Sequence, residues 1–290
     1  MKNWIVVTAL AAGVSAHAAV TVKDDDGNTV TVQKPAQRVI SLAPHVTELL
    51  FAAGGGSHVV GAVAYSDFPE AAKQVPQVGS NRELDLERII ALKPDLFVVW
   101  RHGSSERQIE MVRKLGMPVY HSEPHKLEDI PASLLKLGQL MGTDAVARPA
   151  AADLSSQLAS LRAKYANRAP VRSFYQVWDK PLYTLNGEHI VSDALRLCGG
   201  ENVFARLPVT APVVSVEGVL QENPEAIFAT AEKSYGGVSM WKPYGSLTAV
   251  RNDNLFTIDG NLLNRSGPRM IAGAAMLCEK LELARTHRTK

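Results

Sequence analysis

The sequence has no strong charge of either sign and no long apolar run beyond its first residues. After residue 18 no stretch approaches the roughly twenty apolar residues that a membrane helix needs, so we expect no membrane span. The 290 residues carry a formal net charge of +2, which gives no bias toward polyanions and argues against nucleic acid as a partner. A composition of 46% hydrophobic and 21% charged residues is that of a globular chain.

Familiar catalytic and metal motifs are missing as well. The glycines of AAGGGSH are not followed by Lys-Ser/Thr, so they form no phosphate loop. No serine stands in a G-x-S-x-G elbow, and no paired carboxylates suggest an acid/base set. We therefore expect no enzyme. His121 and His125 of YHSEPH, together with His45, match no standard zinc spacing, and they leave a secreted metal-binding protein or enzyme as an alternative.

Residues 1–18 have the anatomy of a cleavable secretory signal. They contain one early lysine, a short apolar run and the small-x-small sequence AHA at residues 16–18. The apolar run is too short to span a bilayer comfortably. We expect an exported, soluble protein of the periplasm whose mature chain begins near Ala19.

The chain has only two cysteines, and each stands in a helical pattern. Cys198 ends SDALRLC and Cys278 ends IAGAAMLC. In an oxidising compartment a single structural disulfide between them is favoured. Two buried free thiols are the alternative, and neither segment resembles the motif of a cysteine nucleophile.

Short apolar strands alternate with helical stretches, which predicts an α/β fold with mostly parallel sheets. The alternation occurs twice, so we expect an N-terminal lobe at 19–142 and a C-terminal lobe at 169–290, both Rossmann-like. Between them, 143–168 has one apolar stripe at helical spacing and should form a single long helix that joins the lobes. The stripe consists of Leu154, Leu158, Leu161 and Tyr165.

The two halves also share a weak internal repeat. TELLFAAGG from Thr47 matches SDALRLCGG from Ser192, each with a hydroxyl residue as the predicted helix cap, then an acid, an apolar helix and a Gly-Gly stop. A second match relates LDLERIIALKPDLFVVW to VSVEGVLQENPEAIFAT. In it Glu87 and Glu217 each stand seven residues before a proline.

The repeat therefore places one acid near a helix start in each lobe. Leu86, Ile89 and Ile90 are expected to form the apolar face of the first of these helices, so that Glu87 points away from it. Taken alone, each glutamate could be a charge that the helix dipole favours. A matched pair favours a shared function.

Several stretches resemble the periplasmic cobalamin-binding proteins of bacterial ABC importers. They are RVISLAPHVTELLFAAG, YSDFPEAAKQVPQVG, LDLERIIALKPDLFVVWR, CGGENVF and RSGPRMIAGAAMLC, and the resemblance runs from about Arg38 to Cys278. It implies two lobes joined by a rigid helix, a corrinoid (cobalamin) bound between them as cargo, and no resident cofactor. It also implies a monomer whose partners are an ABC permease and its ATPase. Glu87 and Glu217 match the glutamates that dock onto permease arginines in that family.

Trp100 is the ligand-contacting residue that the pattern itself predicts. It ends DLFVVW, and in parallel sheets ligands bind beyond the carboxyl ends of strands. Its ring could lie against a flat macrocycle. The resemblance adds Tyr65 and Tyr183 as aromatic ligand positions and Arg265 as a cleft arginine. Each aromatic could instead pack in the core.

The sequence departs from the family pattern at three cleft positions. Asn81 and Ala211 stand where the family has tryptophans, and Asn261 stands where it has an aspartate. We therefore expect a less aromatic and less acidic cleft, for which Trp178 and Trp241 could compensate. The departures leave a ferric siderophore or haem as the alternative cargo of the same scaffold.

Overall fold

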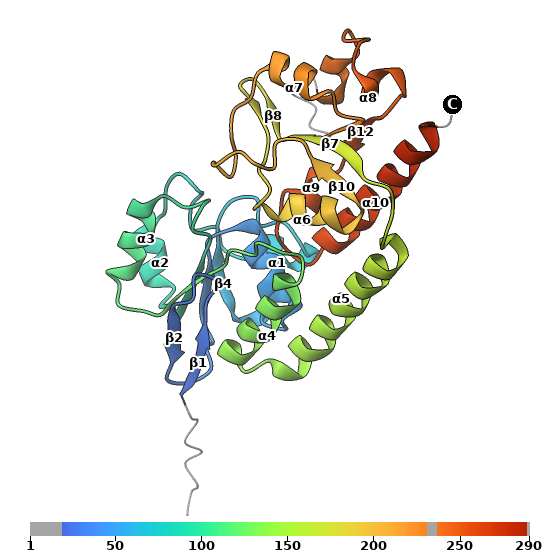
Figure 1. Cartoon of the computed structure of the whole chain (residues 1–290). Coiled ribbons are helices and arrows are strands. Elements are labelled where there is room, and N and C mark those ends of the chain that lie inside the picture. Colours follow the sequence, from blue (N-terminus) through green and yellow to red (C-terminus); the bar gives the residue numbers. More distant parts are fainter. Residues whose placement is uncertain (1–18, 231–236, 289–290) are drawn as a thin grey trace, which may run out of the picture.

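The computed structural model describes residues 19–230 and 237–288, which form two lobes that each have a central sheet (Figure 1). The predicted signal peptide lies outside the described residues. Among those that are described, no helix is both long enough and apolar enough to cross a bilayer.

The N-terminal lobe is built on a parallel sheet of strand order β4-β3-β5-β6. Successive side chains of a strand point to opposite faces, so Val98 packs against one layer of helices and Phe97 against the other. Helices α1 and α4 cover the first face, and α2 and α3 cover the second. The elements are β3 (Val39–Ser41), α1 (Pro44–Ala52), β4 (Val59–Ala62), α2 (Leu86–Ala91), β5 (Leu96–Val99), α3 (Glu106–Arg113), β6 (Val119–His121) and α4 (Asp129–Met141).

The C-terminal lobe repeats this plan with strand order β10-β7-β11-β12, all parallel. Helices α6 and α10 pack on one face of the sheet, and α7 and α8 on the other. The elements are β7 (Val171–Gln176), α6 (Ile190–Leu197), β10 (Gly200–Asn202), α7 (Val216–Glu222), β11 (Ala226–Thr230), α8 (Thr248–Arg251), β12 (Leu255–Ile258), α9 (Gly260–Leu263) and α10 (Met270–His287).

A single helix, α5 (Asp144–Tyr165), connects the two lobes and runs along their side (Figure 1). Leu158 and Tyr165 of the predicted stripe are buried. One apolar cluster continues from the α1 and α4 face of the N-terminal lobe into the α6 and α10 face of the C-terminal lobe. The predicted fold class, two α/β lobes joined by a long helix, is confirmed.

Two antiparallel pairs were not predicted. β1 (Val20–Lys23) and β2 (Thr29–Val32) form a hairpin on the N-terminal lobe, because their alternating valines bury one side of the pair. β8 (Trp178–Asp179) and β9 (Leu182–Tyr183) form a second, shorter hairpin.

The predicted disulfide joins Cys198, just after α6, to Cys278 inside α10, with their Cα atoms 4.8 Å apart. Neither cysteine is free. The bridge therefore ties together two helices of the same lobe.

Local predictions at three helices were wrong. Helix α1 begins at Pro44, so Thr47 is not its cap but lies inside it, buried and bonded to the Ser41 hydroxyl at 2.7 Å; proline is favoured as a first helical residue. Helix α6 begins at Ile190 and is capped by His189, so Ser192 is also internal. On α2, Ile89 is buried but Ile90 is 55% exposed, because a helix this short buries only a narrow stripe.

Candidate ligand-binding cleft

A cavity of about 430 Å³ lies between the lobes at the carboxyl ends of their parallel strands. From the N-terminal lobe it is lined by residues that follow β3, β4 and β5, and from the C-terminal lobe by residues that follow β12. This is the edge at which open parallel sheets bind ligands. The lining residues are Pro44, His45, Tyr65, Asp67, Trp100, Asp259, Gly260, Asn261, Asn264 and Arg265.

Trp100 forms part of the aromatic wall of this cavity. It follows β5 directly and is partly buried. The His45 and Trp100 rings form a T-shaped pair with a centroid separation of 5.3 Å and an interplanar angle of 89°, a favourable geometry for two rings. A Cβ atom at Gly103 would lie 1.8 Å from the Trp100 ring, so only glycine fits beneath it.

Tyr65 is the other aromatic residue of the wall. Its side chain is 80% exposed, and its backbone has φ of 66°, a left-handed conformation that is uncommon for a bulky residue. Strained backbone of this kind concentrates at functional sites. An exposed ring on a strained backbone beside a cavity is therefore a candidate ligand contact.

Arg265 supplies the cationic part of the wall and is paired with acids of the opposite lobe. Its Nη1 lies 2.6 Å from Oδ1 of Asp67 and 3.4 Å from Oε1 of Glu48. The hydrogen bond from Arg265 holds the pKa of Asp67 below its usual value. The positive charge of the guanidinium is therefore already partly neutralised by these acids when a ligand binds.

His45 lines the cavity as a neutral base. Its side chain is almost fully buried, and burial lowers its pKa to about 4, against the opposing effect of a hydrogen bond with the Ser122 backbone. Its Nε2 has no hydrogen-bond partner among the described residues.

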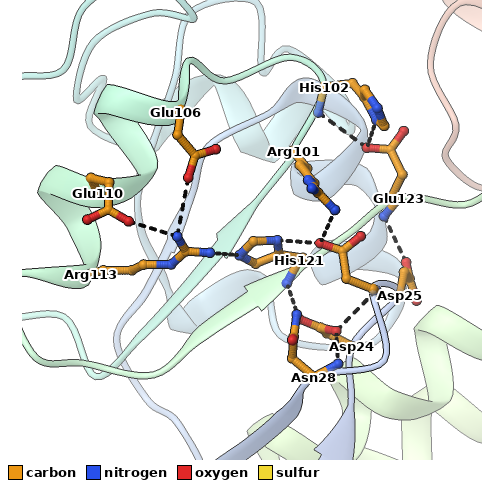
Figure 2. Close-up of polar contacts among 11 residues, drawn as sticks. Asp24, Asp25, Asn28, Arg101, His102, Glu106, Glu110, Arg113, His121 and Glu123 are labelled. Carbon is orange, nitrogen blue, oxygen red and sulfur yellow. Dashed lines mark hydrogen bonds and ion pairs between the residues drawn. The ribbon is translucent and has the colours of Figure 1, made fainter. Parts of the chain in front are cut away.

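An acidic turn supports the segment that follows Trp100 (Figure 2). Asp26, in the turn between β1 and β2, accepts a hydrogen bond from Nδ1 of His121 at 2.8 Å and pairs with Arg101 at 3.4 Å. His102 pairs with Glu123 at 3.0 Å. The hairpin thus connects strand β6 to the loop that carries Trp100.

Three aromatic residues that the sequence suggested for the cleft are not among the described residues that line this cavity. Tyr183 lies in β9 opposite Trp178 and is not among the described lining residues. Trp241 is fully buried, and its indole donates to Oε1 of Gln176 at 2.6 Å. The Trp178 indole donates to the Lys180 carbonyl at 3.1 Å.

The three positions that depart from the family pattern fall in different places. Asn261 lines the cavity, whereas Asn81 and Ala211 are exposed and are not among the described lining residues. The acid that Asn261 lacks is supplied nearby by Asp67 and Asp259, which both line the cavity. Sequence analysis missed these two acids, although each comes shortly after a parallel strand, which is the signal that identified Trp100.

Glu87 and Glu217 lie away from the cavity, one on each lobe, in α2 and α7 (Figure 1). Both are exposed in the first turn of their helix, and no hydrogen bond or ion pair to another described residue is found for either. In each case the residue two positions before the glutamate caps the helix with its side chain, Asp85 in α2 and Ser215 in α7. Their local settings are therefore equivalent, as the repeat predicts.

The three histidines of the alternative metal site have separate settings. His45 faces Trp100, His121 pairs with Asp26, and the backbone N–H of His125 donates to Asp129 at 2.9 Å. In the part of the chain that the structure describes, no group of three or more metal-ligating side chains is placed to hold an ion.

Two parallel-sheet lobes, a connecting helix and a cavity walled by both lobes define a two-lobed α/β binding protein. Residues 39–262 match the family model described as periplasmic binding protein, and the chain belongs to that family.

Its relatives include vitamin B12-binding proteins. One from Vibrio cholerae serotype O1 is 38% identical over 251 residues, which is 86% of this chain and 91% of that protein. One from Yersinia pestis is 37% identical over 248 residues, covering 85% and 86%. The crystal structure of the periplasmic vitamin B12 binding protein BtuF of Vibrio cholerae matches with a TM-score of 0.81 at 36% identity, over 87% of this chain and 98% of that one.

The fold is shared with proteins of other cargo. The periplasmic heme-binding protein HutB of Vibrio cholerae matches with a TM-score of 0.72 at 19% identity, over 84% of this chain and 98% of that one. At this identity the likeness concerns the fold alone.

Proposed function

We propose that this protein captures a corrinoid, cobalamin, in the cleft between its lobes and delivers it to an ABC permease. The observation that carries the proposal is the cavity at the strand ends, where Trp100 and Tyr65 offer aromatic surface and Arg265 a cation. Relatives named for vitamin B12 binding that align over almost the whole chain support the same cargo.

The chemistry of the wall suits a large, flat and amide-rich ligand. Aromatic rings pack against a macrocycle by burying apolar area, and the polar groups of Asp67, Asn261 and Asn264 can bond to side-chain amides. The aromatic surface comes from the N-terminal lobe, because the described lining residues of the C-terminal lobe include no aromatic side chain. Tyr183 remains a proposed ligand contact, reached only if the ligand extends beyond the cavity.

Delivery requires a docking surface on each lobe. We assign it to Glu87 and Glu217, which are exposed, equivalent and remote from the cavity. Arginine is the natural partner of such carboxylates, because its fork donates two parallel hydrogen bonds. The partner is thus an ABC permease with its ATPase, and the binding protein acts as a monomer without catalysis or a resident cofactor.

The proposed function also includes a division of the chain into a signal peptide, two lobes and a connecting segment. Residues 1–18 are removed as the signal peptide, 19–142 and 169–290 form the two lobes, and 143–168 is the connecting segment. Cargo capture then takes place in the periplasm.

Calorimetric titration with cyanocobalamin, haemin and a ferric siderophore such as ferrichrome tests the cargo. We expect one cobalamin to bind per chain and to add its own visible absorption bands to the purified complex. Saturable binding of haemin or ferrichrome with none of cobalamin would overturn the assignment and leave the scaffold with the alternative cargo.

A further inference from the structure

Two acidic side chains join the lobes at positions that the internal repeat relates. Glu48 lies in α1 of the N-terminal lobe, and Asp193 lies at the matching place in α6 of the C-terminal lobe. Glu48 pairs with Arg269, the residue before α10. Asp193 accepts a hydrogen bond from the backbone N–H of Leu127, shortly before α4, at 3.0 Å. Each lobe therefore uses its first long helix to hold the start of the other lobe's last helix.

The contact at Glu48 is the stronger of the two. Nε of Arg269 lies 3.0 Å from Oε2, and its Nη2 lies 2.6 Å from Oε1, so the guanidinium holds both carboxylate oxygens. The Glu48 side chain is only 1% exposed. A bidentate pair of this kind constrains the angle between its partners as well as their distance, and a buried carboxylate requires such a partner.

The surroundings of Arg269 add to this constraint. The centroid of the Phe68 ring, from the N-terminal lobe, lies 3.9 Å from the guanidinium carbon of Arg269, within the range of a cation–π contact. A Cβ atom at Gly267 would lie 3.1 Å from Oε2 of Glu48, so glycine lets the C-terminal lobe approach the carboxylate closely. The N-terminal lobe thus holds the arginine from two sides.

Glu48 also reaches the ligand cavity through Arg265. The Nη1 atom of Arg265 lies 3.4 Å from Oε1 of Glu48 and 2.6 Å from Asp67, while the same arginine lines the cavity. One buried carboxylate therefore faces an arginine that joins the lobes and an arginine of the binding wall.

We propose that Glu48 is the positioning residue of the cleft, which sets the separation of the lobes and the direction in which Arg265 faces the cavity. Asp193 is the second and weaker point of the same interlobe contact. The effect on ligand affinity rests on the proposed function, whereas the effect on lobe separation does not.

Double electron–electron resonance measures the lobe separation without ligand. Spin labels attached through a ketone-bearing non-canonical amino acid at exposed Lys114 and Lys242 report on one lobe each and leave the native disulfide intact. E48Q should broaden the distance distribution and weaken cobalamin binding at least tenfold, with a smaller effect for D193N. E222Q is the matched control, because Glu222 pairs with Arg172 at 2.8 Å within one lobe and should change neither quantity.

A double variant separates positioning from stability. E48Q/R269M removes the buried carboxylate together with its partly buried guanidinium partner. Its stability should therefore recover relative to E48Q, while the distance distribution stays broad and the affinity low. R269M alone carries the test if E48Q does not fold.

The proposal is overturned if E48Q, or R269M in its place, keeps the narrow distribution and the wild-type affinity, or if the double variant regains both. A broadened distribution in a protein that does not bind cobalamin even as wild type would support the positioning role and refute the proposed cargo.

Discussion

Trp100 stands directly after a fully buried strand and lines the cavity. If the ring stacks on cobalamin, Trp100→Ala should weaken binding by about 1 to 3 kcal/mol, on the scale of bases stacked on aromatic side chains. Calorimetric titration of the folded variant measures this loss. Because the ring also packs on His45 and Gly103, some loss of thermal stability should accompany it.

Trp100→Phe is the matched control, because it keeps an aromatic face at the same place. It should retain most of the affinity. A Trp100→Ala variant that is destabilised and yet binds cobalamin normally would show that the residue serves packing alone.

His189 gives the protein a sensitivity to acid. Burial lowers its pKa to about 4 from an ordinary 6.5, helped by His125 and His102, and its Nδ1 accepts the backbone N–H of Val191 at 3.2 Å. Between these two pKa values the unfolded chain binds a proton that the folded chain does not, so the free energy of unfolding falls as the pH falls from about 6.5 toward 4. His45 acts in the same direction.

His189→Asn keeps an acceptor for the helix cap and removes the titration. Between pH 7 and pH 4.5 the free energy of unfolding of the wild type should fall by about 1 to 2 kcal/mol more than that of the variant. The difference stays below the full value for the pKa shift because His189 is only partly buried. Urea denaturation at several pH values measures the difference. Parallel stability curves for the two proteins would contradict the prediction.

The location of a single residue could be predicted where its position at the end of a strand determined it. It could not be predicted where contacts with a distant segment of the chain determined it. Trp100 could be placed at the cavity because a strand leads into it. Tyr183 could not, because the β9 hairpin that carries it has no counterpart in the repeat. The burial of Glu48 between apolar neighbours was a signal that the sequence held, but its partner Arg269 is 221 residues away.

At the scale of secondary-structure elements, the disulfide between the end of α6 and the middle of α10 should be a major contribution to the stability of the C-terminal lobe. The two cysteines are 80 residues apart, and by the loop-entropy model a bridge that closes so long a loop contributes about 4 kcal/mol. The variant C198A/C278A should lose stability of that order in urea denaturation.

Thiol titration provides the chemical check. The unfolded, unreduced wild-type protein should show no reactive thiol, and the reduced protein should show two. Two thiols before reduction would contradict the bridge.

Elements were predicted well where apolar runs are long and less well where burial is one-sided. β5 and β11 are buried at every residue, and continuous apolar runs revealed both. The β1 and β2 hairpin alternates valine with polar residues around an acidic turn, so its composition reads as a polar segment. Helix starts were misplaced because neither cap is a hydroxyl residue. At α1 the cap is Ala43, which is followed by Pro44 and makes no side-chain cap hydrogen bond, and at α6 it is His189.

At the scale of the whole molecule, the matched pair Glu87 and Glu217 should act in docking and not in cargo capture. Removing one member of a charge pair at a buried interface typically costs about 2 to 5 kcal/mol. Glu87→Ala and Glu217→Ala should each weaken complex formation with the permease in lipid discs and leave cobalamin affinity unchanged. The double variant should be worse than either.

Glu83→Ala is the matched control, because Glu83 lines the same surface groove as Glu87 and has no counterpart in the repeat. It should dock normally. Loss of cobalamin binding with docking preserved in the Glu87 and Glu217 variants would move both residues into the cleft and refute their assignment.

The pairing of Glu48 with Arg269 also bears on how the chain completes its fold during synthesis. The strands of the N-terminal sheet are all available once residue 121 has been made, and those of the C-terminal sheet once residue 258 has been made. A nascent or truncated chain that ends at residue 258 can contain both sheets, but in it Glu48 has neither of its arginine partners. Only the segment after residue 258 brings Arg265 and Arg269, so this interlobe pair can form only after that segment has been made.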